Sequence, residues 1–226
     1  MFNLDEFRIR FKKFRTIDYG TYPNCFGEFW KRKLRIESTE ESILDNTHFE
    51  MTFGKLGLTL KAWQWQRPYT FDKLAGRLRN SLGNISQSYN QIRKYNLLEF
   101  DKIPNEPLEI IWHELGSIKT FEKNKGGYYL AMATTKPLMF LWGQTLAFDS
   151  VVRGRMPRFD DASFDLTGNY WTFEQWKEMM LRFQHELRQQ PEAIDLFKKV
   201  SLEEYGNDSA VPYGQFIDLY YWVMHR

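Results

Sequence analysis

Cysteine is almost missing from this chain, and the spacings that usually hold metals and nucleotides are missing too. Cys25 is the single cysteine, which excludes an internal disulfide and a cysteine-built zinc site. The four histidines form no HxxxH or HExxH pair, and Asp160, Asp161 and Asp165 lack the ligand spacing of a calcium loop. No GxxxxGK[ST] or GxGxxG motif occurs. We therefore expect neither a metal nor a cofactor.

An excess of one charge and a long uncharged run are also lacking. The 31 basic and 29 acidic residues leave a net charge of +2, so a nucleic-acid role would need a local basic patch. The first residues carry charges among their apolar positions, unlike a secretory signal. The longest nearly uncharged stretch, 126–148, contains Lys136 and Pro137, so we expect two core helices there and no membrane span. The expected location is the cytoplasm.

Aromatic residues are abundant, at 17% of the 226 residues, which is enough to build a substantial core. The periodicity predicts a mainly α protein: a single compact bundle of about nine to eleven helices, with a small β element near residues 58–64. We expect one domain over 1–226, divisible into an N-terminal subdomain 1–68 and a helical core 69–226.

Local signals predict where several helices begin. Capping boxes of Ser38 with Glu41, Thr172 with Gln175 and Ser201 with Glu204 each predict a helix start. Helices are also expected over 26–34, 71–82, 85–98, 107–118 and 173–189, and after the prolines at 191 and 212.

The most informative stretch runs from 125 to 158 and contains one lysine among apolar residues. A buried lysine has a lowered pKa, and its neutral amine is a nucleophile, so Lys136 is a candidate catalytic residue. Pro137 favours an extended or turn conformation at Lys136, with a helix starting at the proline. Asp149, thirteen positions after Lys136, precedes an apolar pair and is placed to cap a helix.

This stretch resembles the catalytic segment of the helix-hairpin-helix DNA glycosylases. The residues that carry the resemblance are Thr135 and Lys136, an apolar turn, a short loop, and then 147–153 (AFDSVVR). The same outline is similar to segments of uncharacterised helical proteins from bacteria. The resemblance covers about residues 126–153, and the L-P-G-V-G hairpin signature of the glycosylases does not precede Lys136.

The resemblance implies a DNA-associated N-glycosylase with lyase activity. Lys136 would match the Schiff-base lysine, and Asp149 the aspartate that stabilises the cationic sugar. Duplex DNA would then be the partner, with phosphate contacts from Gly126, Gly127, Arg153, Arg155 and Arg158.

Two alternatives remain open. For the two residues, the alternative is that Lys136 reaches solvent and Asp149 only caps a helix. For the protein, the alternative is a non-enzymatic helical interaction module, whose surplus aromatic side chains cover a partner or a self-association face.

Overall fold

A computed structural model describes residues 3, 5–9, 11, 22–39, 41–45, 71–118, 127–156 and 168–223. Within these ranges the protein is mainly α-helical, as the sequence predicts, and it contains one two-stranded sheet. The β element expected near 58–64 lies outside the described residues. The helices and strands are α2 (Tyr22–Glu37), η1 (Ile43–Asp45), α4 (Phe71–Asn84), α5 (Ser86–Ile92), η2 (Leu97–Lys102), α6 (Asn105–Ser117), β1 (Tyr129–Leu130), α7 (Ala131–Trp142), α8 (Ser150–Arg153), β2 (Tyr170–Trp171), α9 (Phe173–Arg188), α10 (Pro191–Tyr205) and α11 (Tyr213–Val223).

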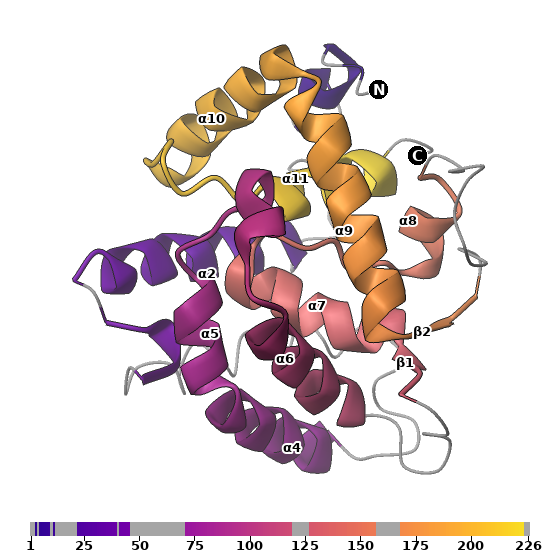
Figure 1. Cartoon of the computed structure of the whole chain (residues 1–226). Coiled ribbons are helices and arrows are strands. Elements are labelled where there is room, and N and C mark those ends of the chain that lie inside the picture. Colours follow the sequence, from indigo (N-terminus) through magenta and orange to yellow (C-terminus); the bar gives the residue numbers. More distant parts are fainter. Residues whose placement is uncertain are drawn as a thin grey trace.

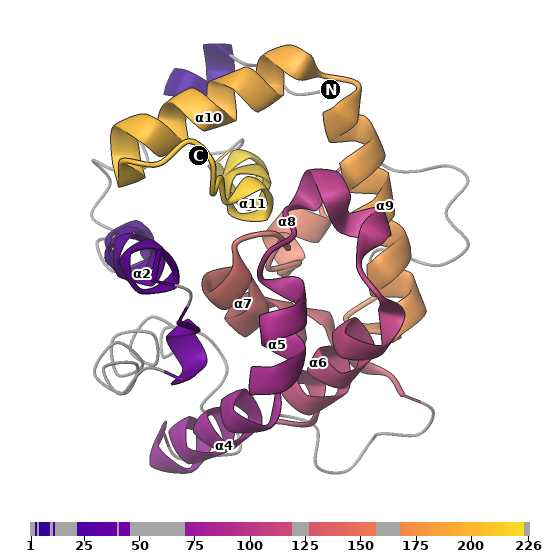
Figure 2. The same ribbon diagram turned by 60° about the vertical axis from the view of Figure 1, so that its left-hand side comes forward.

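Helix α7 lies in the middle of the molecule in both ribbon views (Figure 1, Figure 2). It packs against α2, α6, α11 and β1, and all its residues except Met132 are buried. A helix that is apolar on every side is stable only when other elements surround it. The surrounding helices present amphipathic faces to α7, and together they form one hydrophobic core.

The pair of helices α9 and α10 is the part of the fold that follows most directly from sequence. The Thr172 hydroxyl accepts the N–H of Gln175, and the Gln175 side chain accepts the N–H of Thr172, so the predicted capping box is confirmed. Pro191 occupies the start of α10, where a proline loses no helical hydrogen bond.

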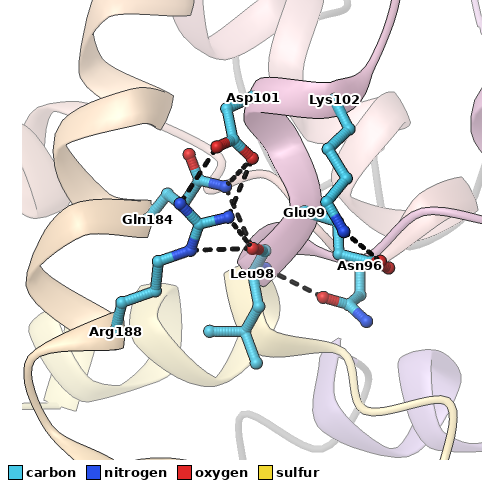
Figure 3. A network of polar contacts seen from close by, with 7 residues as sticks. All are labelled: Asn96, Leu98, Glu99, Asp101, Lys102, Gln184 and Arg188. Atoms are coloured by element: carbon cyan, nitrogen blue, oxygen red, sulfur yellow. Dashed lines mark hydrogen bonds and ion pairs between the residues drawn. The ribbon is translucent and has the colours of Figure 1, made fainter.

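Helix α9 is joined to η2 by a polar network at its C-terminal end (Figure 3). The Arg188 guanidinium donates to both carboxylate oxygens of Asp101 and to the carbonyl of Leu98, and Gln184 donates to the same two residues. This network is half exposed, so water screens its charges and its main effect is to fix η2 on α9.

The short sheet β1–β2 holds the start of α7. Tyr129 pairs with Trp171 and Leu130 with Tyr170, in antiparallel register. Tyr129 packs so closely on Gly116 of α6 that a Cβ there would collide with its ring. The sequence analysis did not predict this sheet, because each strand has only two residues and shows no alternation.

Two of the three predicted capping boxes are wrong. Ser38 follows the end of α2, and its hydroxyl donates to the carbonyl of Arg35, so it belongs to a C-terminal turn. Ser201 lies inside α10, is buried, and donates to the carbonyl of Asn207. Ser and Thr hydroxyls also bind carbonyls at the ends of helices, so the four-residue pattern alone does not distinguish the two ends.

No helix in the described part of the chain is long and apolar enough to cross a membrane.

Candidate functional site

Lys136 lies near the middle of helix α7 and is only 4% exposed. The prediction that Pro137 starts a new helix is wrong, since α7 begins at Ala131 and passes through the proline. Pro137 cannot donate to the carbonyl of Ala133, which normally destabilises a helix. Burial of the whole helix outweighs this local preference, so the expected pair of helices over 126–148 is one helix followed by a loop.

Thr135 connects α7 to the loop that follows it. Its hydroxyl lies 2.8 Å from the carbonyl of Ala131, in its own helix, and 2.7 Å from the carbonyl of Ala147. Thr135, the residue before Lys136, thereby fixes the loop at Ala147 beside α7.

The loop after α7 reaches Asp149 through two left-handed residues. Gly143 has φ of 73° and ends α7. Phe148 has φ of 45°, which is strained for a residue with a side chain. Its ring is fully buried against Trp171, with the ring centroids 4.8 Å apart. Packing of this ring compensates the strain and sets the direction in which the chain enters α8.

Asp149 is the N-cap of α8, as its sequence position predicts. One carboxylate oxygen accepts the N–H groups of Val151 and Val152, each at 2.9 Å. The other oxygen accepts the indole N–H of Trp222, near the end of α11, at 3.2 Å. The carboxylate is 8% exposed and is held by two different elements.

Helix α11 follows this loop closely along its length. The N–H of Gln215 donates to the carbonyl of Gly143, and the carboxylate of Asp218 accepts the N–H of Ala147 at 2.8 Å. Together with Trp222 on Asp149, these contacts are made at successive turns of α11. Gly214 permits the close approach, because a Cβ at this position would collide with the backbone of Gln144.

Lys136, Asp149 and Asp218 are all buried, and the charges of the two aspartates act on the Lys136 ammonium; we call these three residues the lysine–aspartate cluster. Burial lowers the pKa of Lys136, because the charged ammonium loses its hydration. The charges of Asp149 and then Asp218 act in the opposite direction and raise this pKa. The structure therefore buries both Lys136 and Asp149 and shows an electrostatic influence of Asp149 on Lys136. Asp218, which the sequence analysis missed, acts on Lys136 in the same direction.

A signal for Asp218 was available. Gln215 and Asp218 are polar residues on an otherwise apolar helix, and their spacing places them on one face. A buried carboxylate on such a face needs a partner, but the sequence does not say which element supplies it.

The two described arginines proposed as phosphate contacts are bound within the protein. Arg153 is buried and donates to the carbonyls of Phe148 and Gly168 and to the side chain of Asn169. Arg155 donates to the carbonyls of Tyr221 and Trp222. These hydrogen bonds occupy part of each guanidinium.

The glycine pair lies before the sheet, away from the lysine–aspartate cluster in sequence. Gly127 has φ of 78° and lies near the His113 ring. The His113 ring is 3.0 Å from the Tyr129 hydroxyl, whereas Glu114 accepts a hydrogen bond from Asn84, so these neighbours in sequence have different partners. Gly126 and Arg158 lie outside the described residues.

A site for a metal ion is not found among the residues that the structure describes, where no three His, Cys, Asp or Glu side chains cluster.

Fold and site together define a mainly α-helical protein with a buried lysine on whose charge two buried aspartates act. Comparisons with protein-family models, with curated proteins and with solved structures gave no match to this chain.

Proposed function

We propose that the protein associates with duplex DNA and that Lys136 and Asp149 carry N-glycosylase and lyase chemistry on a damaged or modified base. The observation that supports this proposal is that both residues are buried and that the charge of Asp149 acts on Lys136, although they lie on different elements. The resemblance to the helix-hairpin-helix glycosylases implies roles for the same two residues. The cytoplasm is the expected location.

Lys136 would act as the nucleophile. Burial lowers its pKa, so a larger share of the amine is neutral near pH 7 than in an exposed lysine. The amine nitrogen would bond to the anomeric carbon, and the glycosidic bond would break. The base would leave with the bonding electron pair and take up a proton. Loss of the lysine proton and opening of the sugar ring would then give an imine.

Asp149 would stabilise the positive charge that develops on the sugar. Charge stabilisation at fixed positions is a large contribution to catalysis, and a carboxylate held by two backbone N–H groups is fixed. Substrate would reach this oxygen pair only after the Trp222 indole leaves it. Trp222 is partly exposed and lies near the end of α11, which allows such a movement.

Borohydride trapping on duplexes with an abasic or oxidised-base site tests the proposal. Reduction of the imine would leave a covalent protein–DNA adduct in the wild type and none in Lys136→Ala. Lys33→Ala is the matched control, because Lys33 is equally buried but lies in a different cluster, and it should retain the adduct. Asp149→Asn keeps an oxygen for the cap but loses the charge, and base excision should fall about a hundredfold.

Absence of an adduct, together with absence of salt-sensitive binding to any duplex, would contradict the proposal. A second candidate, a non-enzymatic interaction module, would then be favoured. Tyr128 and Tyr170 support it, since they are 45% and 47% exposed. Tyr170 pairs with Leu130, two residues after Tyr128, so both tyrosines lie on the outer face of the short sheet.

A further inference from the structure

A second group of polar side chains lies where α6 meets β1, on elements that carry no residue of the lysine–aspartate cluster. The Tyr129 hydroxyl of β1 is 3.0 Å from the Nδ1 atom of His113, on α6. On the other side of the imidazole, Nε2 is 3.6 Å from a carboxylate oxygen of Glu109, one turn earlier in α6. The three side chains therefore form a row, in which a histidine lies between a hydroxyl and a carboxylate.

The carboxylate of Glu109 influences which ring nitrogen of His113 carries the proton. A neutral imidazole has one N–H group, and a negative charge beside Nε2 favours the proton on that nitrogen. Nδ1 then has an unprotonated lone pair and accepts the hydrogen bond from the Tyr129 hydroxyl. A hydroxyl bound to a histidine that is itself oriented by a third group is the arrangement of an activated nucleophile.

The surroundings of Tyr129 show why its hydroxyl would need a base. The tyrosine is 8% exposed and its ring packs on Gly116, and burial, followed by the charge of Glu114, raises the pKa of the hydroxyl. Phenolate is therefore scarce near neutral pH, so the proton has to be removed while the oxygen reacts. His113 is a base within hydrogen-bond distance of that proton.

The imidazole side of the row is open to solvent, although the tyrosine ring is buried. The side chains of His113 and Glu109 are 44% and 54% exposed, and the hydrogen bond between His113 and Tyr129 is only partly buried. The carboxylates of Glu109 and Glu114 give this place a negative charge, which would repel an anionic phosphate. An uncharged electrophile fits the site better.

We propose that Tyr129 is a nucleophile that accepts an activated acyl group, with His113 as its general base and Glu109 as the residue that positions the imidazole. The phenol oxygen bonds to the carbonyl carbon while its proton passes to Nδ1 of His113. The bond from this carbon to the leaving group breaks, and the leaving group takes the bonding electron pair and the proton from His113. The product is an O-acyl tyrosine. This chemistry is independent of the role proposed for Lys136.

Acetylation by N-acetylimidazole, with the modified peptides quantified by mass spectrometry, tests the proposal. Tyr128 and Tyr170 are internal controls, because they are 45% and 47% exposed and Tyr129 is not. If exposure alone decided the rate, Tyr129 would react more slowly than both. With His113 as its base, Tyr129 should react about fivefold or more faster than either control in neutral buffer.

His113→Gln separates base catalysis from a structural effect. Glutamine can keep a hydrogen bond to the Tyr129 hydroxyl but cannot take up its proton, so acetylation of Tyr129 should fall below that of Tyr128. Circular dichroism checks that the variant is folded. His185→Gln is the matched control, because His185 is an exposed histidine on α9, and it should leave the Tyr129 rate unchanged.

Glu109→Met tests the positioning role. ¹⁵N NMR of the ring nitrogens of His113 reports where the proton lies, and in the neutral wild-type ring it should lie mainly on Nε2. Loss of the carboxylate should lower the share of this form and slow the acetylation of Tyr129 several-fold. A loss of packing alone would not move the proton between the two nitrogens.

Slower acetylation of Tyr129 than of Tyr128 and Tyr170 in the wild type would overturn the proposal and leave the row as a structural contact between α6 and β1. An unchanged Tyr129 rate in His113→Gln would also overturn it. So would a proton on Nδ1 of the neutral His113 ring, because that nitrogen would then donate to the hydroxyl and could not act as its base. None of these measurements contains DNA, so this proposal and the proposed function can fail separately.

Discussion

Lys33 and Lys136 are both buried, with 4% exposed surface each, and burial lowers the pKa of both. Their surroundings differ. The Lys33 ammonium lies 2.6 Å from Glu37, one turn along the same helix, and 4.5 Å from the centre of the Trp30 ring. Lys136 has no acidic residue on its own helix, and its two carboxylates come from a loop and from α11.

Lys33 and Glu37 are close in sequence, whereas the charged groups that act on Lys136 come from separate elements of the fold. Lys33 and Glu37 would be neighbours in any helix with this sequence. The Glu37 carboxylate also accepts a hydrogen bond from the Tyr89 hydroxyl, which joins α2 to α5. The carboxylates of Asp149 and Asp218 act on Lys136 only after α7, the following loop and α11 have packed together. An enzyme site has this second construction, in which charged groups from several elements are held out of water by the whole fold.

The largest expected effect comes from removing a carboxylate from each cluster. Asp218→Ala leaves the Ala147 N–H without its acceptor and takes a negative charge from Lys136, so the free energy of unfolding should fall by about 4 kcal/mol. Glu37→Ala should cost about 2 kcal/mol, because Glu37 is more exposed than Asp218 and Tyr89 keeps its bond to Leu141.

Urea denaturation measures both values, and Asp208→Ala, at an exposed loop position, should change stability by less than about 0.5 kcal/mol. Equal losses of unfolding free energy for Asp218→Ala and Glu37→Ala would show that a carboxylate from a separate element contributes no more to stability than one from the same helix.

The second prediction concerns the contact between the two lysine regions. Gly143, which ends the helix of Lys136, lies against Trp30, the ring beside Lys33. Alanine at 143 would be strained at φ of 73°, and its Cβ would come within 2.5 Å of the Trp30 ring and 2.8 Å of Pro212. Gly143→Ala should lower the free energy of unfolding by about 3 kcal/mol.

Gly206→Ala is a matched control for this variant. Gly206 ends α10 with the same φ of 73°, but no atom lies within 4 Å of a Cβ at this position. Its cost should be about 1 kcal/mol, from backbone strain alone. If thermal unfolding shows equal losses for the two variants, the contact with Trp30 contributes nothing.

The smallest effect is expected in the exposed network of Figure 3. The hydrogen bond from Arg188, followed by that from Gln184, lowers the pKa of Asp101. A carboxylate with a lowered folded pKa stabilises the protein above its unfolded pKa, and this contribution is lost as pH falls through the folded pKa. Arg188→Met should raise the pKa of Asp101 in the folded protein. The free energy of unfolding should then fall less steeply at acidic pH than it does in the wild type.

An NMR titration of the Asp101 carboxyl measures this shift. Lys102→Met is the control, since Lys102 pairs with Glu99 and should leave Asp101 unchanged. An unchanged Asp101 in Arg188→Met would mean that the guanidinium has no electrostatic influence there.

Helix positions could be predicted where the local signal and the packing agree. The apolar stripe of α9 and its capping box at Thr172 are examples. The prediction was wrong where the two conflict. Pro137 indicates a helix start, yet it lies inside α7, because burial on all sides stabilises this helix more than the lost hydrogen bond destabilises it.

The candidate site was predictable in part. Lys136 stands out as a lysine among apolar residues, and Asp149 as an N-cap, and the structure buries the first and confirms the cap of the second. Asp218 and Trp222 did not stand out, because nothing in an apolar C-terminal helix says which loop it will cover.

The sequence by itself determined the mainly helical fold, the starts of α9 and α10 and the cap at Asp149, because these depend on side chains within a few residues of one another. Only the tertiary structure decided that α7 continues through its proline, and that the charges of Asp149 and Asp218 act on Lys136. Charges from separate elements become neighbours only when burial of the apolar faces brings those elements together. Hydrophobic packing of the whole chain therefore fixed the site.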